Sequence, residues 1–432
     1  MKATVKRAFV QLGATRDGLD PYLACAARRD MTTVLVETPA YLRWRRVLHR
    51  QPFGIEIPVS EPEDAEQVAA ALRTHRVVPA LLLAGFERYA ESAFSLAATL
   101  RVAPWPHVGA DFAPPDKLQQ RTGLTRYAPE VLQPRHVHLP LSARGELGPA
   151  HARALEGMAF PQVVKPVDGA GGLGVFQVRD TAERERAVRA AAATTNYGGA
   201  AFTGLLVEEH VEGTEYSVQG IAWNGEARLL SFCEKVILPE ADHADGLRGF
   251  REAGHIAASG AVAPRALQDL AQSCLGATGY RHGPFHIDAI SNGVGPHFLE
   301  MGFRLSGSGL VALVERATGL RWAELVFSTH LDGLEPPAAP YGNGRRAVGQ
   351  LVATQAHQLE RARDLAASHP GVHVELTRKP AGPEELLPDD EAPLASDHRR
   401  HAVVRGRVLL EGDRTDQIRD WLYQCATAER GV

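Results

Sequence analysis

The chain has 432 residues, 44% of them hydrophobic, and a formal net charge of −4. This length suits about three domains, and the small, scattered charge argues against a nucleic-acid face or a membrane-surface patch. Because its cysteines form no CxxC pair, we expect buried free thiols and no zinc site. The N-terminus lacks the apolar run of a signal peptide and no segment is long enough to span a bilayer, so we expect a cytoplasmic protein. The cysteines are Cys25, Cys233, Cys274 and Cys425.

Roughly the first hundred residues alternate buried strand-like runs with helical stretches, which predicts a small α/β layer domain. The run Gly13–Gly18 lacks the GxGxxG spacing of a nucleotide loop, so we interpret it as a structural turn without a cofactor. The expected strands are Ala8–Leu12, Thr33–Val36 and Ala80–Leu83, and the expected helices are Pro21–Arg29, Asp64–Arg76 and Glu87–Leu100.

From about Ala110 the pattern changes, and an amphipathic helix opens at Asp116-Lys117. The proline-rich stretch Leu334–Gly344 is typical of a linker or a domain edge. Beyond it we expect two more strands around a helix, and then a mobile surface loop. These segments are Ala347–Thr354, His357–Ala367, Val372–Leu376 and Pro380–Ser396.

A strand, Val163–Pro166, ends in a lysine and leads into a cluster of glycines, from Gly169 to Gly174. Glycines let the backbone approach an anion with its N–H groups, and Lys165 adds a compact positive charge. Only six of the 47 basic residues are lysines, which draws attention to each of them. The segment predicts a phosphate-binding flap; the alternative is a tight hairpin with a solvated lysine.

The run Val207–Val211 ends a second predicted strand, and Glu215 starts the next one after a short turn. A connector of this kind can hold an adenine through its main chain, while a nearby carboxylate accepts from ribose hydroxyls. An acidic surface hairpin is the alternative.

Two carboxylates, Asp288 and Glu300, lie on short apolar runs joined by a turn, and Arg304 follows. The pattern predicts a hairpin that brings both carboxylates together. Such a pair beside an arginine suits a divalent cation held against phosphate oxygens. An exposed acidic ladder is the alternative interpretation.

In this order, the segments from roughly Asp116 to Leu320 resemble the ATP-grasp superfamily of carboxylate–amine or thiol ligases. The resemblance implies an α/β fold, α+β in its central part, with ATP held between two α+β subdomains. It also implies three domains. We expect an N-terminal α/β domain at 1–109, a central ATP-binding subdomain at 110–209, and a C-terminal subdomain at 210–432 with an extension after about residue 334.

The resemblance implies roles for individual residues. Lys117 and Lys165 match the two lysines that bind ATP phosphates. The main chain of Glu209 and Val211 matches the adenine contact, and Glu215 matches the ribose ligand. The other residues expected at the nucleotide are Gly171, Gly172, Gly174 and Glu208.

By the same resemblance, Asp288 and Glu300 bind Mg²⁺, as one or two ions that Mn²⁺ can replace, and Arg304 acts on the transferring phosphoryl group. Many members carry asparagine two residues after the second acid, where this chain has Gly302. Metal binding would then rely on the two carboxylates, ATP oxygens and water, which magnesium tolerates.

The stretches Phe232–Lys235 and Phe250–His255 resemble the branch that contains the L-amino-acid ligases, which make dipeptides and related amides. This narrower resemblance places Lys235 and His255 at the reaction centre. For His255, a satisfied structural histidine is the alternative. The loop Ser306–Gly309 would lie beside the acyl substrate.

The activity implied is ATP-dependent joining of a small carboxylic acid to an amine through an acyl phosphate, with release of ADP. The implied partners are those two small molecules, without nucleic acid or membrane, and a homodimer is common among such enzymes. Two rivals stay open. One is an ATP-grasp carboxylase or nucleotide-biosynthesis ligase with another acceptor, and the other is a non-catalytic Mg-ATP-binding module.

Overall fold

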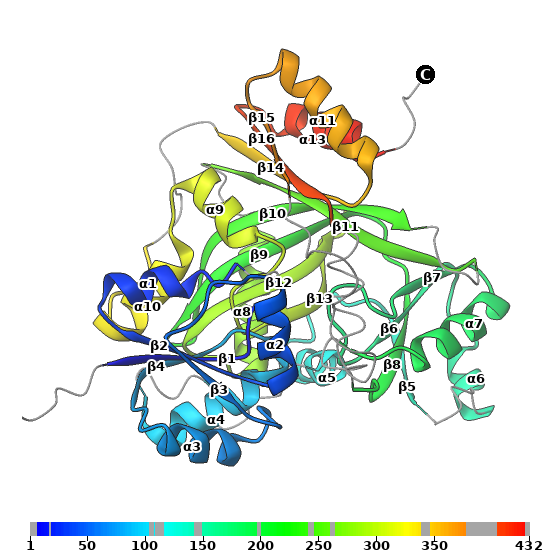
Figure 1. Ribbon diagram of the computed structural model, residues 1–432. Helices are drawn as coiled ribbons and strands as arrows, with labels where there is room; N and C mark the ends of the chain where they lie inside the picture. The colour runs from blue at the N-terminus through cyan, green and yellow to red at the C-terminus, as the bar shows by residue number, and fades with distance from the viewer. Residues whose placement is uncertain are drawn as a thin grey trace, which may run out of the picture.

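The structure is a computed structural model, which describes residues 7–16, 19–102, 108, 116–141, 149–196, 200–240, 246–259, 264–337, 346–376 and 404–427. These residues form one four-stranded and one twelve-stranded sheet, with helices packed around both (Figure 1). Among them, no helix combines the length and the apolar character needed to cross a membrane.

The four-stranded sheet belongs to the N-terminal part, is parallel throughout and has the strand order β3-β2-β1-β4. The central strand β1 is buried on both faces because helices cover both. On β1, Phe9 packs into one cluster with α1 and α2, whereas Val10 packs into another with α3 and α4. The predicted strands and helices are confirmed. They are β1 (Ala8–Leu12), β2 (Thr32–Glu37), β4 (Pro79–Ala84), α1 (Tyr22–Arg28), α3 (Ala65–Thr74), the 3₁₀ turn η1 (Glu87–Tyr89) and α4 (Ala90–Leu100).

Two elements of this part were not predicted, the helix α2 (Pro39–Val47) and the edge strand β3 (Ile55–Pro58). The start of α2 had a recognisable signal, because Thr38 accepts a hydrogen bond from the Tyr41 N–H and a proline follows it. β3 is short and only partly buried, which leaves little apolar pattern to detect.

The central part forms an antiparallel run of the large sheet in the order β7-β6-β8-β5. Its first helix, α5 (Lys117–Tyr127), begins where predicted, and the Asp116 carboxylate caps it by accepting from the Gln119 N–H at 2.9 Å. The other elements are β5 (His136–Pro140), α6 (Pro149–Leu155), β6 (Gln162–Pro166), β7 (Phe176–Val178), α7 (Thr181–Ala192) and β8 (Gly204–Glu209).

The rest of the large sheet continues in the order β13-β12-β9-β10-β11, again antiparallel. It meets the central part where β11 pairs with β7, through only two residue pairs, Arg248 with Gln177 and Gly249 with Phe176. The elements are β9 (Thr214–Trp223), β10 (Glu226–Glu240), β11 (Arg248–Ala258), α8 (Arg265–Thr278), β12 (Gly283–Ser291), β13 (Pro296–Gly302), α9 (Leu310–Thr318) and α10 (Trp322–Asp332).

The last part of the chain adds three strands to the edge of β11, covered by two helices at the top of Figure 1. The predicted strands and helix are confirmed as β14 (Ala347–Ala353), β15 (Val372–Leu376) and α11 (Ala356–Ser368). β16 (Gly406–Gly412) and α13 (Thr415–Ala426) complete the unit. The predicted loop Pro380–Ser396 and residues 338–344 of the predicted linker lie outside the described residues.

The N-terminal part docks on α10 through an aromatic cluster. Phe9 lies 5.1 Å and Tyr22 5.6 Å from Phe327, measured between ring centroids. At the rim of this contact, Arg28 and Arg29 pair with Glu324. This docking places the segment that follows β4 beside the end of β13.

All four cysteines are buried and free, as predicted. Burial raises the pKa of Cys233 to about 12, so this thiol stays protonated at neutral pH.

Candidate active site

A cleft of about 1690 Å³ lies where the three parts of the chain meet. Its walls come from the β6–β7 loop, the β8–β9 connection, the faces of β10 to β13, and the loop after β13, with residues of the N-terminal loop after β1 at its edge. All fourteen residues predicted for the site line it. They are Lys117, Lys165, Gly171, Gly172, Gly174, Glu208, Glu209, Val211, Glu215, Lys235, His255, Asp288, Glu300 and Arg304.

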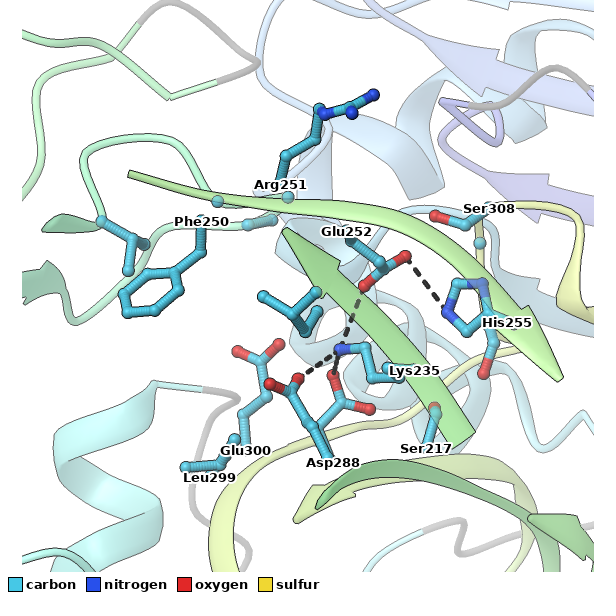
Figure 2. A pocket seen from close by; sticks show the side chains of 18 of the residues that line it. Ser217, Lys235, Phe250, Arg251, Glu252, His255, Asp288, Leu299, Glu300 and Ser308 are labelled. Carbon is cyan, nitrogen blue, oxygen red and sulfur yellow. Dashed lines mark hydrogen bonds and ion pairs between the residues drawn. The ribbon is translucent and has the colours of Figure 1, made fainter. Parts of the chain in front are cut away.

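Lys235, on β10, is the centre of a buried charge cluster (Figure 2). Its Nζ donates to Asp288 Oδ2 at 2.8 Å and forms ion pairs with Glu215 Oε1 at 2.7 Å and Glu252 Oε2 at 3.0 Å. Burial by itself lowers the pKa of Lys235, but the three carboxylates outweigh it and raise the pKa well above its ordinary value. The three carboxylates therefore favour the charged form of this lysine.

His255 lies across from Lys235, because the two residues are cross-strand partners on β11 and β10. Its side chain is 2% exposed, and Nε2 lies 3.3 Å from Glu252 Oε1 (Figure 2). Burial would raise the pKa of Glu252, but Lys235 and His255 hold it well below its usual range. Glu252 thus fixes both residues that were predicted to face the reaction centre.

Asp288 and Glu300 are directly opposite each other on the predicted hairpin of β12 and β13. Glu300 Oε2 forms an ion pair with Lys117 Nζ at 2.7 Å, and the same nitrogen donates to the Gly169 carbonyl at 2.6 Å. Asp288 has 8% of its surface exposed. The interpretation of these acids as an exposed ladder is therefore wrong for Asp288.

Lys165 reaches the cleft from the end of β6 and is buried rather than solvated. Its Nζ pairs with Glu208 Oε2 at 2.8 Å, while Arg121 pairs with the other oxygen of Glu208 at 2.6 Å. Burial lowers the pKa of Lys165, which Glu208 partly opposes. The solvated-lysine alternative is thus wrong, and both oxygens of Glu208 are already used to hold cations.

The glycine loop that follows Lys165 needs glycine for its backbone shape. Gly171, Gly172 and Gly174 have φ values of 62°, 78° and 69°, a region that side chains with a Cβ rarely adopt. The loop connects the antiparallel strands β6 and β7 and lines the cleft. Its amides can therefore approach a ligand closely, as the predicted flap requires.

The predicted adenine-binding segment follows β8. Glu209 is tied to the start of β5 by its N–H, which donates to the Arg135 carbonyl at 2.9 Å. The ring of His210 stacks parallel to the ring of Phe250 on β11, with centroids 6.4 Å apart. Val211 is half-buried and lines the cleft.

Arg304 lies at the end of the cleft nearest the N-terminal part. Its Nη1 donates to the Leu305 carbonyl at 2.7 Å, and its Nε forms an ion pair with Glu87 Oε2 at 3.2 Å. The neighbouring loop is held from the C-terminal part, where Gln350 donates to the Ser308 carbonyl at 2.5 Å.

Comparison with known proteins assigns part of the chain to a domain family. Residues 158–311 match the model of the ATP-grasp domain family. The chain carries an ATP-grasp domain. Among solved structures, an L-amino acid ligase from Bacillus licheniformis is 18% identical with a TM-score of 0.68, covering 98% of each chain. A carboxyaminoimidazole ribonucleotide synthase from Aspergillus clavatus, complexed with ATP, is 16% identical with a TM-score of 0.66, covering 98% of this chain and 97% of that one.

The predicted ATP-grasp resemblance and fold class are therefore confirmed. A curated relative, dapdiamide A synthase from Enterobacter agglomerans, is 26% identical over 160 residues. The match spans 37% of this chain and 37% of the length of that protein.

The carboxylate pair of this ATP-grasp domain fits a divalent cation. Asp288 Oδ1 is buried and makes no hydrogen bond within the described part of the chain. Within the same residues, no group of three or more acidic, histidine or cysteine side chains is arranged to hold a metal by itself. Asp288 and Glu300 would supply two oxygen ligands, and the other positions would fall to ATP and water, as suits magnesium.

Arg121 and Glu252 are two of the contributors to the site that were missed from the sequence. Arg121 lies one helical turn after Lys117 on α5, and this i,i+4 spacing was a usable signal. Glu252 and His255 are three apart on a strand, which normally puts side chains on opposite faces. A bulge in β10–β11 pairing brings them to one side, because Ile237 pairs with Glu252 and the preceding Val236 pairs with Gly254.

Proposed function

We propose that this chain is an ATP-dependent ligase that joins a carboxylic acid, an amino acid or a small peptide-like acid, to an amine. The acid would be activated as an acyl phosphate, with release of ADP and then phosphate. The observation that carries the proposal is that one cleft joins Lys117 and Lys165, a cross-strand carboxylate pair and Arg304. A site built only to bind a nucleotide has little need for the whole set.

On the nucleotide side, Lys117 and Lys165 would hold ATP phosphates while the loop Gly169–Gly174 covers them. Both lysines are positioned by carboxylates, Glu300 and Glu208 respectively. An ammonium held in place before the nucleotide arrives needs little reorganisation on binding, which favours phosphoryl transfer through positioning and charge neutralisation.

In the first half-reaction, a carboxylate oxygen of the acid would attack the γ-phosphorus, and the bond from that phosphorus to the bridging oxygen of ADP would break. In the second, the amine would attack the carbonyl carbon, phosphate would leave, and the nitrogen would lose a proton. Arg304 suits the negative charge that builds on the transferring group or on the tetrahedral oxyanion. His255, which contacts Glu252 and lines the same cleft, would take the proton.

A magnesium ion held by Asp288 and Glu300 would neutralise charge on the β- and γ-phosphate oxygens. Lys235 supports this site from the protein side, because its ammonium binds Asp288. The chain thus orients the carboxylate before any ion binds.

The proposal is tested by measuring ADP release with Mg-ATP and pairs of amino acids or small acids, with hydroxylamine added to trap an acyl phosphate. We expect hydroxamate with one class of acid and amide product once an amine is added. Asp288→Asn should raise the magnesium concentration needed for half-maximal rate, while the exposed Asp269→Asn should not.

Two outcomes would contradict the proposal. ADP release that depends on bicarbonate, with no hydroxamate from other acids, would favour a carboxylase. Binding of Mg-ATP without ADP release with any acid would identify a non-catalytic nucleotide-binding module.

A further inference from the structure

Gly302 stands where many ATP-grasp sequences have an asparagine, and the structure shows what fills the space. Gly302 pairs across the hairpin with His286. A Cβ on Gly302 would overlap the His286 ring, lying 2.5 Å from its Nε2, and would also lie 2.8 Å from Glu87 Oε2. The glycine is therefore required for space, because two other side chains occupy the position of the missing one.

Both of these side chains contact the segment that carries Arg304. His286 Nδ1 lies 3.2 Å from the Arg304 carbonyl, and since a carbonyl only accepts, the histidine donates. Glu87 Oε1 accepts from the Phe303 N–H at 3.0 Å, while Glu87 Oε2 pairs with Arg304 Nε at 3.2 Å. One carboxylate thus fixes the backbone before the arginine and the guanidinium itself.

Glu87 comes from the N-terminal part of the chain, in η1 after β4, more than two hundred residues before Arg304. In this ion pair the Glu87 side chain is only 20% exposed and the Arg304 side chain only 19%. An ion pair at this burial is screened less than a solvated surface pair, so it holds the orientation of the guanidinium more firmly. Through Glu87, the N-terminal part therefore contacts Arg304 directly.

We infer that Glu87 and His286 are positioning residues for Arg304, and that Gly302 is the space that admits them. The inference rests on the proposed function, in which Arg304 stabilises charge on the transferring group. The residues act through Arg304 rather than on substrate. Glu87 sets the direction of the Arg304 guanidinium, and His286 fixes the Arg304 backbone through its carbonyl.

The test is a double-mutant cycle between Glu87→Gln and Arg304→Ala in the full-length chain. The isosteric Glu87→Gln keeps an acceptor for the Phe303 N–H but loses the charge that pairs with the guanidinium. We expect a fall in kcat on the order of 10-fold, the scale of the coupling between two residues in contact, with an unchanged KM for ATP. In the Arg304→Ala background the same substitution should cause no further loss.

The control is Glu91→Gln, an exposed glutamate in the helix that follows η1, which should leave kcat unchanged. Additive losses in the double mutant would overturn the inference, since Glu87 would then act independently of Arg304. An unchanged kcat in Glu87→Gln would overturn it as well.

A second readout does not depend on turnover. Labelling with phenylglyoxal, mapped by mass spectrometry, reports how freely the Arg304 guanidinium reacts. We expect faster labelling of Arg304 in Glu87→Gln than in the wild type or Glu91→Gln, and equal rates would contradict the ion pair's role. If the wild type releases no ADP with any acid, the proposed function fails, while the labelling still decides whether Glu87 restrains Arg304.

Discussion

Asp288 and Glu300 face each other across the β12–β13 hairpin, and each already binds a lysine. Asp288 pairs with Lys235, and Glu300 pairs with Lys117. Each ammonium offsets the charge of the acid it binds, although Lys235 is also shared with Glu215 and Glu252. If Asp288 and Glu300 hold a divalent cation as proposed, Lys117 would be free to leave Glu300 and contact an ATP phosphate.

Arg304→Ala should reduce turnover by on the order of 10²-fold or more, the usual scale for losing a preorganised charge stabiliser. The check is the kcat for ADP release, together with thermal unfolding to establish that the variant is folded. Arg265→Ala serves as the control, because that arginine is 92% exposed. Near-normal turnover in Arg304→Ala would remove the residue from the proposed mechanism.

Lys235→Met should destabilise the protein strongly, because it leaves Asp288, Glu215 and Glu252 close together without their shared cation. Removing one partner of a buried ion pair costs about 3–5 kcal/mol. Urea unfolding in EDTA measures this cost. Magnesium should then restore part of the stability of the variant, since the carboxylates gain a replacement cation.

The matched control for Lys235 is Arg265→Met, whose exposed ion pair with Asp269 should contribute less than about 1 kcal/mol. Equal unfolding midpoints for Lys235→Met and the wild type would show that the cluster does not stabilise the fold.

The contribution of Glu300 to the stability of the fold should depend on pH. Burial would raise the pKa of Glu300, but Lys117 and its hydrogen bond lower it from an ordinary 4.5 to about 2. A depressed pKa stabilises the folded state above the unfolded pKa, and this contribution is lost as the pH falls through the folded value. The Tm difference between the wild type and Glu300→Gln should therefore be full above about pH 5 and should shrink progressively towards pH 2. A difference that stays constant over this range would contradict the Lys117–Glu300 pairing.

The glycine loop should become protected when nucleotide binds. We expect limited proteolysis between Gly169 and Gly174 to slow with Mg-ATP, because a closed flap excludes water and protease alike. Gly174→Ala should weaken this protection, since its φ is 69° and an added Cβ would lie 3.1 Å from Pro166. Gly276→Ala is the control, because a Cβ there meets nothing within 4 Å. Cleavage rates that do not respond to Mg-ATP would argue against a moving flap.

The sequence was sufficient to predict the parts of the site that depend on local order. The β12–β13 hairpin was predictable because a turn separates two apolar runs, and it places Asp288 opposite Glu300. Lys117 was predictable because Asp116 is a good helix cap. Lys165 was predictable because it ends a strand before glycines that need positive φ.

Contacts that depend on tertiary docking were not predictable. Glu87 reaches Arg304 only because the N-terminal part packs on α10 through Phe9 and Tyr22. Glu252 reaches His255 only because a bulge overrides the strand alternation. Neither a rigid docking of two parts nor the position of a bulge leaves a periodic pattern in the sequence.

The short pairing between β7 and β11 affects how the two halves of the large sheet can move. Two residue pairs make the twelve-stranded sheet continuous, yet so short a junction resists bending weakly compared with the long ladders on either side. We expect the two halves of the sheet to move as rigid bodies about this junction. The half that carries Lys165 could then move away for nucleotide exchange while the hydrogen bonds between its own strands stay intact. Amide hydrogen exchange should then be faster at Phe176 and Gly249 than within β9 or β12, and equal protection would count against the hinge.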